Sequence, residues 1–217
     1  MIRLLASIAL LLAGCSGGTP TPPPSGATTF SNVAASAWQA QYSAGVSIVP
    51  ASVGWQFAFP ATPDSVHYVV APANLTLNTA QTITAQVAIT GNAPVFEETA
   101  TPGQSCVGTP AVRLFVQQQG DDLSGAGAYA YARWWSNPAA VDLALGTFTL
   151  TATLAPNSWS GIFGEQGGSS AAATAGFQTA IAHIGNIGVT FGGCFFGHGA
   201  DLKSGSAIFG MKGFAAQ

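Results

Sequence analysis

Side chains suited to ligand binding are concentrated in one stretch of the chain, Tyr129-Ala130-Tyr131-Ala132-Arg133-Trp134-Trp135-Ser136. We expect residues 128–136 to form a strand, in which successive side chains point to opposite faces of a sheet. One face would then carry three aromatic rings and a guanidinium, from Tyr129, Tyr131, Arg133 and Trp135. Aromatic rings stack on the apolar C–H faces of sugar rings, and a guanidinium donates hydrogen bonds to hydroxyls, so this face is suited to a glycan.

Polar side chains on the preceding predicted strand, residues 112–119, extend this candidate site. Gln117 and Gln119 lie on that strand, and Asp121 and Asp122 follow at its end. If the two strands pair, the amides and carboxylates supply further hydrogen-bonding partners for hydroxyls. The combination resembles the binding face of sandwich-type carbohydrate-binding modules, in architecture and in residue type. This resemblance implies a non-catalytic module that binds polysaccharide.

The same residue types also build protein cores, which leaves a structural alternative open. In a β-sandwich, Tyr and Trp are core-formers, and a buried Arg can hold a sheet edge or a loop in place. Exposure of the four side chains on a concave sheet face would favour binding. Their burial would instead favour a structural or adhesive envelope protein that contacts other proteins through its polar faces.

Catalytic chemistry has few residues to draw on. Carboxylate doublets occur at Glu97-Glu98 and Asp121-Asp122, but neighbours on a strand face opposite sides. A glycan-acting hydrolase, a further alternative, would need one carboxylate from each doublet. No Gly-x-Ser-x-Gly elbow, His-Glu-x-x-His motif or phosphate-binding loop is present. We therefore predict no enzyme activity and no cofactor, with a structural calcium at Asp121-Asp122 as the alternative.

The elements that must position these residues are short strands. Period-2 alternation bounded by Gly, Pro, Asn and Asp predicts strands over residues 55–59, 66–70, 82–90, 112–119, 128–136, 146–154, 187–191 and 207–211. In 82–90 the pattern places Ile83, Val87 and Ile89 on the buried face. One helix is predicted over 170–183 from apolar residues at three- and four-residue spacing. This pattern indicates an all-β, two-sheet antiparallel sandwich, jelly-roll-like, over residues 30–217.

The composition restricts the partners. Only 6% of the residues are charged, and the formal net charge is −3. Without Arg3, which lies in the predicted signal, four basic residues remain. They cannot supply the phosphate-neutralising patch that nucleic-acid binding requires. We therefore expect no nucleic-acid partner and a neutral, polar surface.

The N-terminus indicates export and membrane attachment. Met1-Ile2-Arg3 precedes a short apolar run that ends in Leu12-Ala13-Gly14-Cys15. This ending resembles the lipobox of bacterial lipoproteins, which implies cleavage before Cys15 and lipidation of its thiol. An ordinary signal peptide is the alternative. Residues 1–14 are thus the predicted signal, and the Pro- and Gly-rich residues 15–29 the tether.

The resemblance also implies a place in the cell envelope. Ser16 follows the lipidated residue, where an aspartate usually marks retention at the inner membrane. We therefore expect the outer membrane in a Gram-negative source, and otherwise the outer face of the cytoplasmic membrane.

Two cysteines remain once Cys15 is lipidated. In an oxidising compartment, Cys106 and Cys194 are expected to form a disulfide, with free thiols or a metal pair as alternatives. His198 lies four residues after Cys194, between two glycines. It is either available to a ligand or bonded to a turn backbone; two cysteines and one histidine at this spacing make a poor zinc site.

Overall fold

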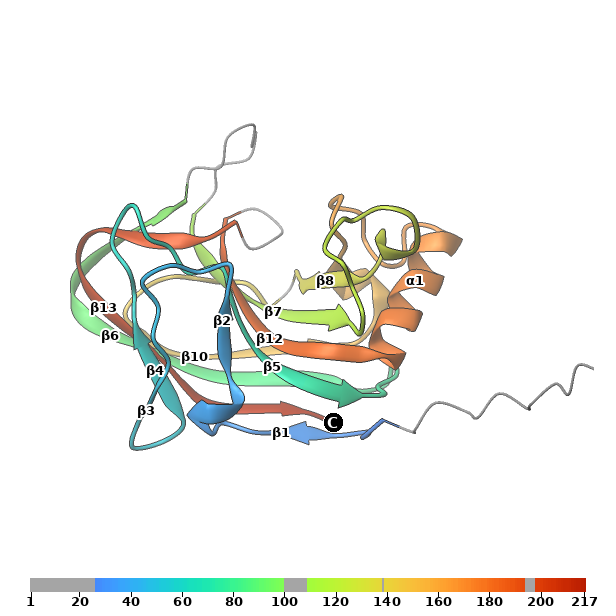
Figure 1. Ribbon diagram of the computed structural model, residues 1–217, viewed down its shortest axis with the longest axis horizontal. Coiled ribbons are helices and arrows are strands. Elements are labelled where there is room, and N and C mark those ends of the chain that lie inside the picture. The colour runs from blue at the N-terminus through green and yellow to red at the C-terminus, as the bar shows by residue number, and fades with distance from the viewer. Residues whose placement is uncertain (1–25, 100–108, 138, 194–197) are drawn as a thin grey trace, which may run out of the picture.

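The computed structural model describes residues 26–99, 109–137, 139–193 and 198–217, and they form two packed antiparallel sheets (Figure 1). Sheet I contains, in spatial order, β10 (Gly146–Thr153), β6 (Thr82–Glu98), β13 (Ala200–Ala216), β4 (Trp55–Ala58) and β3 (Val49–Pro50), and β1 (Phe30–Ser31) also pairs with β13. Sheet II contains β11 (Trp159–Ser160), β8 (Arg133–Ser136), β7 (Ala111–Gln118), β12 (Ile184–Gly192), β5 (Tyr68–Leu75) and β2 (Gln39–Gln41), and β9 (Val141–Asp142) also pairs with β7. The predicted two-sheet antiparallel β-sandwich is confirmed.

Alternation of apolar and polar residues decides which face of sheet I is buried. In β6, Ile83, Val87 and Ile89 are buried, as predicted. The neighbouring β10 carries threonines at every second position, and Thr84 of β6 lies directly opposite Thr151, with 3.4 Å between the hydroxyl oxygens. The outward side chains of β10 and of the β6 segment paired with it are therefore mainly uncharged, while the inner face packs into the core.

β6 and β13 are longer than the predicted strands and run side by side over most of their length (Figure 1). Their pairing is interrupted by register shifts, one of them near Gly205, where φ is +81°. A Cβ at Gly205 would lie 2.2 Å from the carbonyl oxygen of Ala93, so only glycine allows the two backbones to approach here. At its first residue, Ala200, β13 lies beside the segment that leads into β5 of sheet II, because Val66 and Ala200 exchange backbone hydrogen bonds.

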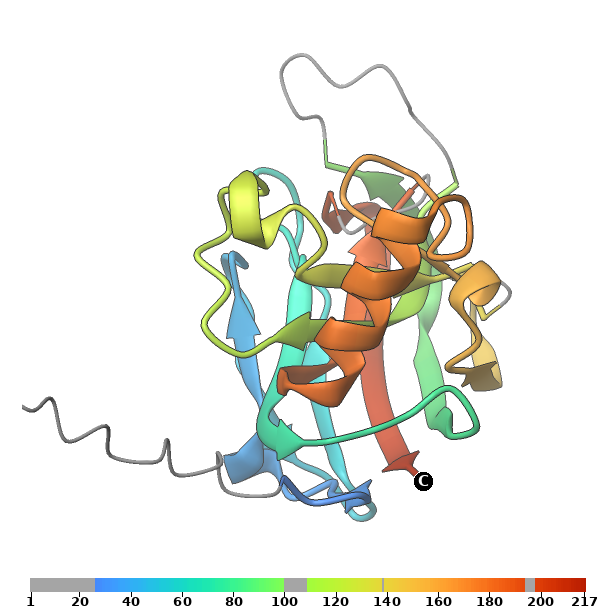
Figure 2. The same cartoon turned by 90° about the vertical axis from the view of Figure 1, so that its right-hand side faces the viewer.

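The predicted helix is confirmed as α1 (Ala171–Ala182), which lies across one end of the sandwich (Figure 2). Ser170 caps its first turn, because the Ser170 hydroxyl accepts a hydrogen bond from the Ala173 N–H (3.0 Å). Phe177 is fully buried and packs against Trp134, with 5.1 Å between ring centroids. Helix α1 thus closes the core where sheet I does not cover sheet II.

The strand predicted over residues 128–136 is wrong in its first half. Residues Gly127–Tyr129 form a 3-10 helix, and the strand β8 begins only at Arg133. Ala130, inside the predicted strand, has φ −57° and ψ −26°, which is the helical and not the extended region. Tyr129 and Tyr131 therefore do not share a sheet face with Arg133 and Trp135.

Candidate functional site

Strand register brings the candidate side chains onto the outer face of sheet II, away from the main core. β7 pairs with β8 so that Phe115 lies opposite Trp135 and Gln117 lies opposite Arg133. Phe115, Trp135 and Val70 of β5 form a small apolar cluster separate from the main core, and Tyr68 and Ile162 pack against it. The outer face is therefore built around an aromatic centre rather than being evenly polar.

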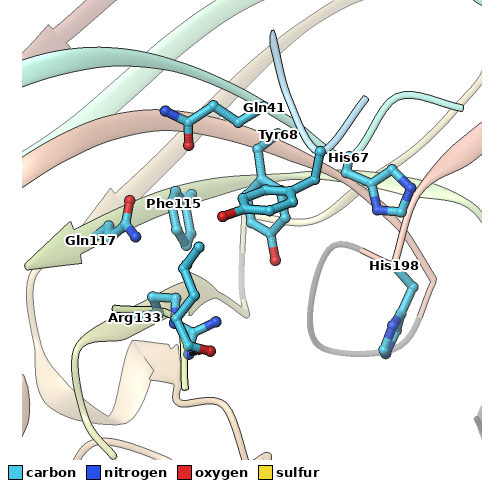
Figure 3. Close-up of a pocket in the computed structure, with 9 residues that line it drawn as sticks. Gln41, His67, Tyr68, Phe115, Gln117, Arg133 and His198 are labelled. Carbon is cyan, nitrogen blue, oxygen red and sulfur yellow. Dashed lines mark hydrogen bonds between the residues drawn. The ribbon is translucent and has the colours of Figure 1, made fainter. Parts of the chain in front are cut away.

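A pocket of about 350 Å³ opens on this face (Figure 3). Its walls come from β2 and the residue after it, the start of β5 and the residue before it, the second half of β7, the start of β8, the β7–β8 loop, and the segment before β13. The lining residues are Gln41, Tyr42, His67, Tyr68, Phe115, Gln117, Leu123, Arg133 and His198. Residues far apart in the chain thus meet at one site.

Aromatic rings run in contact from the pocket mouth to its floor. Tyr42, at the mouth, is 63% exposed, and its ring meets Tyr68 edge-on at 6.0 Å. Tyr68 contacts Phe115 at 5.1 Å, and Phe115 contacts the buried Trp135 at 5.3 Å. Tyr42 can therefore offer a ring to a ligand, while the deeper rings hold it in position.

A polar network lines the opposite wall. Asp121 accepts hydrogen bonds from Gln117 Nε2 (2.8 Å) and from the Leu123 N–H (3.0 Å). Gln117 Oε1 in turn accepts from Asn186 Nδ2 (2.8 Å). These bonds fix the Gln117 amide and the start of the β7–β8 loop, so this wall is ordered before any ligand arrives.

Arg133 is held by the same network. Its Nε forms an ion pair with Asp121 Oδ2 at 3.0 Å, and its Nη2 donates to the Leu123 carbonyl oxygen (2.9 Å). The Asp121 side chain is fully buried and that of Arg133 is 12% exposed. The charge of Arg133 is thus compensated next to the pocket, and one edge of the guanidinium remains accessible.

Burial controls ionisation in the pocket. It raises the pKa of Tyr68 from 10.0 to about 12, against the opposing effect of Arg133, so the phenol is neutral at physiological pH. Burial also lowers the pKa of His198, although Glu98 partly opposes this. In the Arg133–Asp121 pair, the carboxylate compensates the charge of the guanidinium.

His67 completes the wall beside His198 (Figure 3). Its Nε2 lies 2.9 Å from Ser65 Oγ, and its backbone N–H donates to Ser43 Oγ (2.9 Å). These contacts orient the imidazole, and Ser65 itself is buried.

The structure divides the predicted site residues into three groups. Gln117 and Arg133 line the pocket, and Asp121 supports them from behind. Trp135 is only 1% exposed and lies beneath the pocket, which is the structural role foreseen as the alternative. Tyr129, Tyr131, Gln119 and Asp122 are not among the lining residues.

Two of these outlying side chains have clear local roles. The Tyr131 ring stacks on Trp134 at 6.1 Å and faces Gly176 of helix α1. Asp122 accepts a hydrogen bond from the Ser124 N–H (2.9 Å) and so shapes the β7–β8 loop. The hydroxyl and backbone of Ser124 hold the pKa of the exposed Asp122 carboxyl below its usual value.

Sequence reasoning missed most of the aromatic wall. Phe115 could have been predicted as part of this wall, because it lies two residues before Gln117 on β7 and therefore on the same face. Tyr68 also lay inside a predicted strand. Tyr42 carried no signal: it follows a three-residue strand and adopts a φ of +53°, which its residue type does not favour.

The three cysteines, Cys15, Cys106 and Cys194, fall outside the residues that the structure describes, so lipidation and the disulfide stay predictions. Within the described ranges, no three His, Cys, Asp or Glu side chains converge as metal ligands would. The same ranges contain no helix both long and apolar enough to traverse a bilayer.

Fold and pocket together define a two-sheet antiparallel β-sandwich with an aromatic-lined hollow on the outer face of one sheet. A scan against protein-family models and a search of curated proteins both find no match. Among solved structures, the chain is similar to a "xylan-binding module CBM15", with 16% sequence identity and a TM-score of 0.44, over 88% of this chain and 96% of that one. Likeness at this level transfers neither a ligand nor a residue role to this chain.

Proposed function

We propose that this protein is a lipid-anchored envelope protein whose β-sandwich binds a neutral glycan in the sheet II pocket. The observation that carries the proposal is the pocket itself, where the exposed ring of Tyr42 stands across from the fixed polar groups of Gln117 and Arg133. Sugars present an apolar C–H face and a rim of hydroxyls. An aromatic ring facing amide and guanidinium groups complements both surfaces.

The charge balance supports a neutral ligand. Arg133 is the one permanently cationic side chain among the described lining residues, and Asp121 already compensates its charge. An anionic ligand would have to compete with Asp121 for the guanidinium. Hydroxyls do not need a free charge, because the Gln41 and Gln117 amides can both donate to them and accept from them.

The position of the pocket also supports a role at a surface. The chain joins the sandwich at Ala27, whose N–H donates to Asn74 O (3.0 Å) beside the end of β5. Tyr68 lies at the start of the same strand, about 23 Å away at the rise of an extended chain. A body tethered through residues 15–29 would therefore hold the pocket away from the membrane end.

A second candidate function is adhesion to other proteins through the outer face of sheet I. Thr147, Thr149, Thr151 and Thr153 form an exposed row on β10, next to Thr84 and Gln86 of β6. Such a face offers hydroxyls and methyls without charge, which suits a broad contact with a protein partner. It contains no hollow comparable to the sheet II pocket among those described, so it is the lesser candidate.

The test is retention on polysaccharides. The mature lipidated chain, in detergent micelles, would be passed over a panel of neutral polysaccharides (glucan, xylan, mannan) and acidic ones (polygalacturonate, alginate). We expect retention on at least one neutral polymer, and a loss of affinity of about tenfold for Tyr42→Ala, the worth of one aromatic stacking contact.

The matched control is Ile208→Ala, which removes an exposed apolar side chain from the outer face of sheet I. It should bind as the wild type does. If no polymer retains the protein, or if Tyr42→Ala and Ile208→Ala behave alike, the glycan proposal is wrong. Retention that depends on Ile208 instead would favour the face of sheet I.

A further inference from the structure

A second exposed aromatic ring stands at the opposite edge of sheet II. Phe163 is 70% exposed, the highest value among the large apolar side chains described, and follows the edge strand β11. Tyr42, at 63%, follows the other edge strand, β2. Exposed aromatic rings therefore flank this sheet on both sides.

The loop that carries Phe163 lies against the pocket-bearing face. Ile162, its neighbour, packs against the cluster of Phe115 and Trp135 on the outer face. A Cβ built on Gly125 would lie 2.7 Å from Ile162 Cδ1 and 3.5 Å from Arg133 Nη2. The loop therefore sits directly beside the Arg133 wall of the pocket.

This loop is closed by its own hydrogen bonds. Gly161 N–H donates to Glu165 O (2.8 Å), and Gly164 N–H donates to Gly161 O (3.1 Å). The backbone N–H of Phe163 donates to Glu165 Oε2 (3.1 Å). Phe163 is thus presented on a tight turn, and its ring can meet a ligand without first ordering the chain.

Contacts connect the two rings across the sheet. From Tyr42 they pass through Tyr68 and Phe115 to Ile162, the residue before Phe163. Five strand spacings separate β11 from β2, which is about 24 Å across the sheet. A single sugar cannot reach both rings, whereas an oligosaccharide lying across the strands can.

We infer that Phe163 is a second stacking platform, and that the site binds an internal stretch of a neutral polysaccharide laid across the strands from Tyr42 to Phe163. This inference rests on the proposed glycan binding and adds that the ligand is an internal stretch of a chain. A chain-end or monosaccharide receptor would enclose its ligand in the pocket and gain nothing from Phe163. A sheet surface with an aromatic ring at each edge gains affinity with each sugar until the chain reaches both rings.

The experiment is titration calorimetry of the mature chain with cello-, xylo- and manno-oligosaccharides, from the monosaccharide to the hexasaccharide. We expect affinity to rise with chain length, by about tenfold between the shortest and longest ligands that bind. Phe163→Ala should remove this gain while leaving the affinity for the shortest ligand unchanged. Phe163→Trp should preserve the gain, and Leu145→Ala, an exposed apolar change next to sheet I, should have no effect.

The outcomes separate the inference from the proposed function. Binding with no dependence on length, or with equal losses at every length for Phe163→Ala, overturns the inference and leaves glycan binding intact. No heat with any oligosaccharide, together with no retention on any polysaccharide, overturns both. Because Phe163 is exposed on a surface loop, unchanged thermal unfolding of Phe163→Ala would confirm that affinity alone was altered.

Discussion

Tyr68 shows how one residue acquires its properties from its neighbours. In the sequence it is an ordinary strand residue, yet in the structure it lies between the exposed Tyr42 and the buried Phe115. Removal from water favours its neutral phenol, because the ionised form would lose hydration. Ionisation of this pocket residue at alkaline pH should therefore lower the stability of the fold.

We predict that the protein loses stability between about pH 10 and about pH 12 through Tyr68. The pKa of Tyr68 is about 12 in the folded state, against 10.0 for a free phenol, so the folded state retains the proton longer. The stabilisation is complete below pH 10 and is lost as pH rises through 12, by roughly 2–3 kcal/mol. Chemical denaturation across this range would measure it.

The control is Tyr68→Phe, which keeps the ring and removes the ionisable hydroxyl. Its free energy of unfolding should fall less over the same range, and the late step should vanish from the ultraviolet titration of tyrosinate. An identical pH dependence in wild type and Tyr68→Phe would contradict this prediction.

At the scale of elements, helix α1 and the β7–β8 loop depend on each other. The loop places Tyr131 against the helix at Gly176, the one position in α1 without a side chain. Trp134, in the next strand, packs on Phe177 from the same direction. The aromatic row predicted for one strand face is thus divided between a helix contact and a pocket wall.

We predict that Gly176→Ala destabilises the protein. In an exposed helix this change stabilises by about 1 kcal/mol, because alanine has the higher helix propensity. Here the new Cβ would lie 2.3 Å from Tyr131 Cβ, so the helix or the loop must move. Urea denaturation should show a loss of about 1–3 kcal/mol.

The same substitution in a Tyr131→Gly variant tests whether contact with Tyr131 causes the loss. In Tyr131→Gly the obstructing atoms are gone, so Gly176→Ala should become neutral or stabilising there. If the change stabilises the protein when Tyr131 is present, the packing described for this contact is wrong.

For the whole molecule, the attachment point and the pocket lie at opposite ends of β5. This arrangement suits a protein held at a membrane and turned towards a ligand outside it. The predicted disulfide would likewise join two segments that are distant in the sequence. Cys106 and Cys194 lie outside the described residues, so the disulfide stays a prediction.

We predict that Cys15→Ser releases the protein from the membrane fraction. In the proposed lipoprotein the Cys15 thiol carries the lipid, and two or more acyl chains are needed for a stable anchor. Detergent-phase partitioning and intact mass would detect the loss of lipid. Ser16→Ala should stay anchored, and membrane retention of Cys15→Ser would contradict the lipoprotein assignment.

Local pattern was sufficient for the fold class. Half-buried strands such as β6 and β10 alternate at period 2, because one face meets the core and the other meets water. The helix was equally readable from the three- and four-residue spacing of its apolar residues. Gln117, Asp121 and Arg133 were foreseen as neighbours, since pairing of β7 with β8 follows from their adjacency in the chain.

Only the tertiary structure decided which aromatic side chains line the pocket and which are buried. Trp135 and Tyr42 are both aromatic, but loops over the outer face of sheet II bury the first, and a left-handed backbone at the edge of the sheet exposes the second. The pocket joins residues 41 to 198 through register between strands distant in sequence. Sequence periodicity reports the environment along one strand, whereas a site on a sheet is assembled across strands, where only long-range pairing determines the neighbours.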